Sequence, residues 1–126
     1  MKPRFALLFL FTTMTLGCGK SEEEGKPTGA TCPTDSSLTY ESFGSAFMDT
    51  YCLSCHSKTV TGADRMDAPA DHNFDTVNEI RGFADHIDEH AGAGPGATNT
   101  LMPPDDPSPS LEQRMQLSTW LACGAP

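Results

Sequence analysis

The hexapeptide YCLSCH at residues 51–56 constrains this chain more than any other stretch. It holds two cysteines separated by two residues, and a histidine directly follows the second cysteine. Such a motif serves different chemistry in reducing and in oxidising compartments. Paired thiols stay reduced in a reducing compartment, whereas they tend to form disulfides in an oxidising one. The compartment therefore has to be established before the motif can be interpreted.

The first residues are typical of an export signal. Lys2 and Arg4 form a short positive end, and the apolar stretch at 5–11 is far shorter than the roughly 20 residues that a membrane-spanning helix needs. The end of the segment resembles a bacterial lipoprotein signal, in which the cysteine after a small residue is lipidated. We expect residues 1–17 to be removed and Cys18 to anchor the chain to a cell-envelope membrane, facing the periplasm. Plain secretion with cleavage nearby is the alternative.

The charge balance limits the partners. The chain has 8 basic and 17 acidic residues, a net charge of −9, and the predicted signal removes two basic residues and no acidic one. A chain this acidic is not suited to nucleic acid or to anionic lipid head groups, so we expect partners with basic protein surfaces. The alternative is that the acidity serves only solubility.

Composition divides the rest of the chain into a tether and one domain. Residues 18–36 are predicted to form the lipidated N-terminus and a flexible acidic tether, because 19–31 are polar and charged. Residues 37–126 then form one small domain rich in Gly and Pro. An unaided core is marginal at this size, and a large buried cofactor would stabilise it.

Three segments have the apolar spacing of amphipathic helices, at about 40–51, at 75–92 and from Ser110 onward. Two of them begin with a capping box, formed by Thr76 with Glu79 and by Ser110 with Gln113. The segment between the last two helices is rich in Gly and Pro and is predicted to be an irregular loop. The sequence therefore predicts an all-α domain.

The five cysteines divide into three groups. Cys18 is assigned to the lipid and Cys52 and Cys55 to the motif, which leaves Cys32 and Cys123 near the two ends of the domain. In an oxidising compartment, two remaining thiols tend to pair. A disulfide between them would close a loop of about 90 residues and stabilise the fold by roughly 4 to 5 kcal/mol.

Three uses of the motif can now be compared. A thiol-disulfide switch usually opens a helix after a strand, whereas this motif follows a predicted helix in a domain without predicted strands. A structural zinc site would need a fourth ligand and usually a second cysteine pair. Covalent haem attachment needs this spacing, with Cys52 and Cys55 adding to the two vinyl groups and His56 binding the iron. We therefore predict one covalently bound haem c.

The second axial ligand is predicted to be Met102. It lies in the sequence LMPP of the irregular loop, where two prolines stiffen the chain, and a thioether is a soft neutral ligand that favours ferrous iron. Met48 and Met115 lie on predicted helices and are expected in the core. Met66 lies only ten residues after His56, which leaves little chain to cross from one face of the ring to the other.

The other histidines have alternative interpretations. His72 is an alternative sixth ligand or a contact of a haem propionate. His86 and His90 are four residues apart on the second helix and could bind a divalent metal. They lie away from the apolar stripe of that helix, so we expect them on a solvated face.

From about 40–124 the chain resembles the small monohaem class I c-type cytochromes. The resemblance rests on YCLSCH, on LMPP some 46 residues after His56, and on the terminal amphipathic helix. It implies a fold in which the first and last helices cross, with a middle helix and long irregular loops around the haem.

Finer features of that family find matches in this sequence. Gly44, eight residues before the first motif cysteine, matches the glycine that lets the two helices cross closely, with Leu117 and Trp120 as its partners. Met48 stands where the family often has an aromatic residue. The family uses a proline carbonyl to accept the proximal imidazole proton, and Pro69 is the nearest candidate.

The resemblance implies a periplasmic electron carrier with His and Met ligands on iron. Because both ligands stay bound, no small-molecule substrate is expected, and the partners are redox proteins with basic contact surfaces. Two alternatives remain: a peroxidase-like haem enzyme whose sixth position opens, and a sensory or structural haem module of a larger complex.

Overall fold

The structure is a computed structural model, and it describes residues 24–126. The predicted signal at 1–17 and the predicted lipidation site Cys18 lie outside the described residues. Across 24–126, none of the helices has the length and apolar character needed to cross a bilayer.

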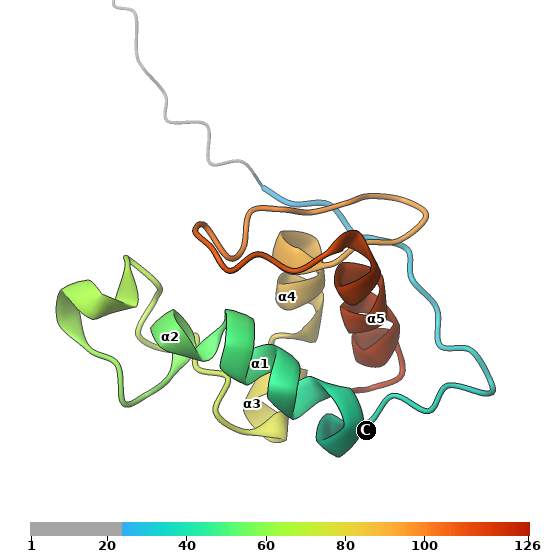
Figure 1. The fold of residues 1–126 in the computed structure, drawn as a ribbon, viewed down its shortest axis with the longest axis horizontal. Helices are drawn as coiled ribbons and strands as arrows, with labels where there is room; N and C mark the ends of the chain where they lie inside the picture. Colours follow the sequence, from blue (N-terminus) through green and yellow to red (C-terminus); the bar gives the residue numbers. More distant parts are fainter. Residues whose placement is uncertain (1–23) are drawn as a thin grey trace, which may run out of the picture.

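The described part of the chain is helical. The elements in order are η1 (Tyr40–Gly44, a π-helical turn), α1 (Ser45–Tyr51), α2 (Leu53–His56), η2 (Gly62–Arg65, a 3-10 turn), α3 (Val77–Gly82), α4 (Ala84–Ala91) and α5 (Leu111–Ala122) (Figure 1). Within 24–126 there is no β-strand, and the one extended pairing is an isolated bridge between Ala93 and Thr98. The predicted all-α class is confirmed.

Local hydrogen bonds determine where the helices begin. In both predicted capping boxes, the backbone N–H of Glu79 or Gln113 donates to the hydroxyl three residues before it, and the side chain of the same residue accepts in return. These bonds satisfy backbone donors that a helix start leaves unpaired. Thr39 and Ser42 form a third box at η1, where serine stands in place of the usual Glu or Gln, so the sequence pattern does not predict it.

Two predicted helices are interrupted. Cys52 leaves the helical conformation at φ −122°, so the motif continues in the separate short helix α2. The helix expected at 75–92 breaks at Phe83 into α3 and α4. The preceding Gly82 has a low helix propensity, and the break lets the Phe83 ring pack edge-on against Phe74, with centroids 5.9 Å apart.

The π-helical turn η1 contacts α5 at Gly44. A Cβ on this buried glycine would lie 2.4 Å from Cζ2 of Trp120, so only glycine fits here without displacing the indole. Trp120 and Leu117 are fully buried, and the Tyr40 and Phe43 rings pack on the indole. The close approach expected between Gly44 and Trp120 is present, and Leu117 on the same helix as Trp120 is buried in the core.

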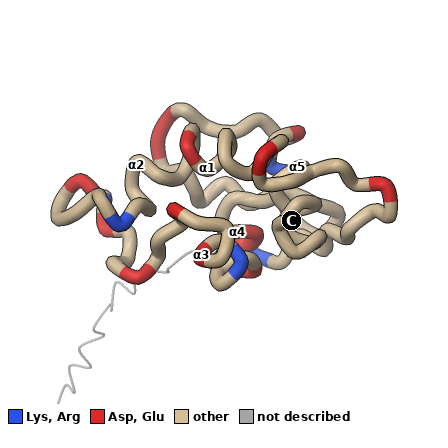
Figure 2. The backbone as a smooth tube through the Cα atoms, turned by 90° about the horizontal axis from the view of Figure 1, so that it is seen from below, with Lys and Arg blue, Asp and Glu red and all other residues tan. Residues whose placement is uncertain are grey.

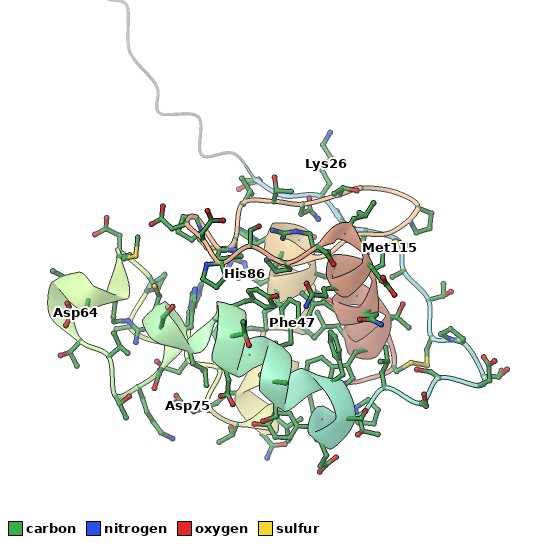
Figure 3. The ribbon with its side chains drawn as sticks, in the orientation of Figure 1. Lys26, Phe47, Asp64, Asp75, His86 and Met115 are labelled. Carbon is green, nitrogen blue, oxygen red and sulfur yellow. A yellow bond between two sulfur atoms is a disulfide. The ribbon has the colours of Figure 1, made fainter. Side chains whose placement is uncertain are left out.

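One methionine prediction is right and one is wrong. Met48 is 1 % exposed and lies in the core, whereas Met115 is 50 % exposed. The buried face of α5 is completed by Arg114 and Ser118, which turns Met115 to the outer side of the helix. Figure 3 shows Met115 on that outer side.

The segment before the helices is attached to the rest of the domain at several places, of which a disulfide and the bonds of Thr28 are two. Cys32 and Cys123 form the predicted disulfide, with their Cα atoms 4.7 Å apart and a sequence separation of 91. Thr28 is fully buried and donates to the Asp88 carboxylate from its N–H at 3.0 Å and its hydroxyl at 2.9 Å. The expectation of a flexible tether is therefore wrong at Thr28, because that prediction rested on composition and missed the carboxylate acceptor on α4.

Candidate functional site

A mainly apolar cavity of about 470 Å³ brings the predicted site residues together. Its walls come from α1 and α2, from the loop after η2, from α4 and from the loop before α5. Cys52, Cys55, His56 and Met102 all line it, although up to 50 residues separate them in sequence. The volume lies within the roughly 300–1,000 Å³ of small-molecule and cofactor sites.

His56 ends α2 and is held in a defined orientation. Its Nδ1 lies 3.0 Å from the carbonyl oxygen of His72, and its ring stacks on buried Phe74 with centroids 4.6 Å apart. Because a carbonyl only accepts, Nδ1 carries the proton and Nε2 keeps a lone pair. Burial lowers the pKa of His56, which favours the neutral ring that a metal ligand requires, although the His72 bond opposes this shift.

The acceptor of the His56 proton differs from the one expected. The Pro69 carbonyl accepts from Nη2 of Arg65 at 2.7 Å, whereas the His56 bond goes to His72. The prediction of Pro69 is therefore wrong. Pro69 still lines the cavity, and the position of its carbonyl depends on Arg65, whose role the sequence did not indicate.

Arg65 is the centre of the loop that follows His56. The side chain is 7 % exposed, and its N–H groups donate to Ser57 O, Val60 O, Ala68 O, Pro69 O, His72 O and Asn73 Oδ1 at 2.7 to 3.2 Å. These acceptors engage all the donors of a guanidinium. Arg65 therefore organises the loop and fixes the carbonyl to which His56 donates.

Cys52 and Cys55 are the described cysteines outside the disulfide. Burial, followed by the nearby Cys55, raises the pKa of the Cys52 thiol to about 12. A thiol-disulfide switch needs a thiolate near neutral pH, which depends on a lowered pKa. The environment of Cys52 therefore disfavours that alternative and favours a neutral Cys52 thiol beside the apolar cavity.

Met102 lies in a loop that is held by its backbone. Its N–H donates to the carbonyl of His90 at 2.9 Å, and its own carbonyl accepts from Nη1 of Arg114 at 2.8 Å. Arg114 is 3 % exposed and also donates to Ala91 O, Asn99 O and Ser108 Oγ. The Met102 side chain, 36 % exposed, borders the cavity.

The remaining histidines form a row along the cavity. The ring centroids of His72 and His86 lie 4.8 Å apart, and those of His86 and His90 lie 4.0 Å apart. His86 and His90 precede buried Ile87 and Ala91 by one residue, about 100° around the helix, and this edge of α4 faces the cavity. The expectation of a solvated face is therefore wrong. Figure 3 shows His86 pointing into the space between α1 and the loop before α5.

Burial, followed by the neighbouring His90, His72 and His56, lowers the pKa of His86. This shift favours the neutral imidazole of His86. Within 24–126, no three His, Cys, Asp or Glu side chains are grouped so that they could hold a metal ion.

Acidic side chains border the cavity. Asp67, Asp105 and Asp106 contribute to its wall. Lys58 does not neutralise them, because it pairs with Glu79 at 4.0 Å elsewhere on the described surface. Figure 2 shows acidic positions spread over helices and loops, with few basic ones between them. A partner that meets the mouth of the cavity therefore meets negative charge.

These residues fit a covalently attached haem. The cavity offers two unpaired thiols, an imidazole with its Nε2 lone pair available, a thioether and apolar walls, which is the donor set that the group requires. Comparison of the chain with protein-family models, with curated proteins and with solved structures gives no match.

Proposed function

We propose that this protein is a c-type cytochrome that carries electrons through one haem c. The observation that supports this most is that Cys52, Cys55, His56 and Met102 line the same apolar cavity, in which a carbonyl already fixes the orientation of His56. The all-α architecture and the contact between Gly44 and Trp120 support the cytochrome c fold as part of the same proposal.

Each site residue has a defined task in this proposal. Cys52 and Cys55 would form the two thioether bonds to the haem, and His56 through Nε2 and Met102 would bind its iron. The bound iron supplies reversible one-electron chemistry, with a thioether ligand raising its potential. Arg65 and Arg114 fix the backbone of the loops on the two sides, which keeps the carbonyl that orients His56 and the backbone of Met102 in place.

The surroundings of the cavity support transfer to a protein partner. The aspartates at its border favour a partner with a basic contact surface, met in a small and polar encounter. We propose a periplasmic location with a lipid anchor at Cys18, and no small-molecule substrate. Acidity around the site gives no support to a nucleic-acid partner.

The test is a spectrum of protein made in a host that attaches haem. We expect mass spectrometry to show one haem bound through Cys52 and Cys55, rapid electron exchange with an electrode, and the weak long-wavelength charge-transfer band of His/Met ligation. Met102→Ala should abolish that band, whereas Met115→Ala, on the outer side of α5, should leave it unchanged. Absence of covalent haem would refute the proposal. Fast binding of cyanide by the resting protein would favour a haem enzyme, and slow electron exchange a sensory module.

A further inference from the structure

The cavity contains a second histidine arranged like His56. Nδ1 of His90 lies 2.9 Å from the carbonyl oxygen of His86, so this nitrogen carries the proton and Nε2 keeps its lone pair. His56 has the same arrangement with the His72 carbonyl, at 3.0 Å. Metal-binding histidines commonly make such a bond from the second ring nitrogen, because it fixes the tautomer and the ring orientation. The geometry therefore marks two histidines that line the same cavity, His56 on α2 and His90 on α4.

His90 also lies beside the methionine of the site. The Met102 N–H donates to the His90 carbonyl at 2.9 Å, so the two side chains start from neighbouring points of the backbone, and both line the cavity. Met102 is 36 % exposed, whereas His90 is half-buried. A neutral nitrogen donor and a neutral sulfur donor thus lie at the same border of the cavity.

We infer that His90 is an alternative sixth ligand, which competes with Met102 for the iron of the haem. The inference rests on the proposed function. An imidazole suits ferric iron, whereas a soft thioether favours ferrous iron, so oxidation shifts the balance towards His90 and reduction shifts it towards Met102. The exchange breaks an iron–sulfur bond and forms an iron–nitrogen bond. The Nδ1 proton stays on the ring, and the exchange itself transfers no electron.

His86 provides the matched control. It lies one turn before His90 on the same helix, also lines the cavity and has its ring between those of His72 and His90. A glutamine at either position removes one imidazole while keeping a polar side chain on the same edge of α4. A difference between H86Q and H90Q therefore reports on the particular ring and not on a general change of the cavity wall.

The first experiment removes the competing thioether. Ferric haem-loaded M102A is expected to remain low-spin and six-coordinate by electron paramagnetic resonance, M102A/H86Q is expected to match it, and M102A/H90Q is expected to become high-spin and to bind cyanide at once. A high-spin M102A, or a low-spin M102A/H90Q, would overturn the inference and leave the proposed function intact.

A second measurement keeps Met102 and does not depend on the stability of the double variants. The ferric wild type is expected to show two low-spin species, of which only one accompanies the charge-transfer band. H90Q is expected to lose the species without that band, and H86Q to retain both. A single species shared by the wild type and H90Q would overturn the inference. Absence of covalent haem from the wild type would instead overturn the proposed function, and this inference with it.

Discussion

Two loops flank the cavity, and a buried arginine organises each of them in a different way. In the loop at 57–73, Arg65 donates only to acceptors three to eight residues away. In the loop at 98–110, Arg114 donates from α5 to acceptors six to 23 residues away, including the end of α4. The His56 side is thus held by local bonds, whereas the Met102 side depends on how α4 and α5 pack.

The largest effect is expected from Arg114→Met. The change leaves the carbonyls of Ala91, Asn99 and Met102 without their donor inside the domain, and such losses add to about 3 to 5 kcal/mol of unfolding free energy. Denaturant unfolding measures the loss. If the proposed function holds, the charge-transfer band assigned to Met102 should disappear at a lower denaturant concentration than the rest of the haem spectrum changes.

Arg81→Met is the matched control for Arg114. Arg81 also donates to backbone carbonyls, those of Gly124 and Ala125, but its side chain is exposed, so we expect a cost of about 1 kcal/mol or less. Equal losses for the two variants would contradict the special role of Arg114 in the Met102 loop.

A smaller and more local effect is expected from Arg65→Met. The loop at 57–73 is largely exposed, so water can replace many of the lost bonds, and we expect about 2 kcal/mol. Amide hydrogen exchange should become faster at Val60, Met66 and Ala68, whose N–H groups bond within the loop, and should stay slow in α5. Arg114→Met should speed exchange in both regions. Faster amide exchange in α5 of the Arg65 variant would show that Arg65 also stabilises α5. The effects of the two arginines would then not differ in how far they extend through the fold.

This contrast also explains which features the sequence could predict. Capping boxes and the Gly44 position depend on fixed spacings within a short segment, and the disulfide depends on the number of cysteines, so these predictions hold. Arg65 and Arg114 were not identified, because a buried arginine is explained only by carbonyls whose positions the whole fold determines. The predictions that fail at Thr28, Met115 and Pro69 each depend on contacts with distant parts of the fold, which the local pattern does not specify.

The backbone after η2 is another feature that the sequence does not predict. Met66 and Asp67 have positive φ values of 50° and 67°, a conformation that glycine adopts far more readily. No glycine or asparagine in the sequence marks this turn. Arg65, which donates to the carbonyls of Ala68 and Pro69 just beyond it, helps to hold the turn in place. The error at Pro69 has this origin, because the loop that decides which carbonyl meets His56 has no local signature.

The smallest effect is expected at Asp75, whose carboxylate binds the first two residues of the 57–73 loop. Asp75 accepts from the Ser57 hydroxyl at 2.6 Å and from the Lys58 N–H at 2.9 Å, and these bonds, the first above all, lower its pKa. The hydrogen bonds by which Arg114 holds the Met102 loop involve no such carboxylate. Because the pKa of Asp75 is depressed in the folded state, its stabilisation is present above the unfolded pKa and is lost as the pH falls through the folded one.

Asp75→Asn tests this asymmetry between the loops. We expect the variant to be less stable than the wild type by about 1 kcal/mol or less at neutral pH, since the group lies near the surface. The difference should shrink towards zero as the pH falls below about 4, where the wild-type carboxylate becomes protonated. Asp49→Asn, on the exposed side of α1, serves as the control and should show no comparable change. A difference between wild type and Asp75→Asn that stays constant from neutral to acid pH would show that the 57–73 loop does not depend on the charge of Asp75.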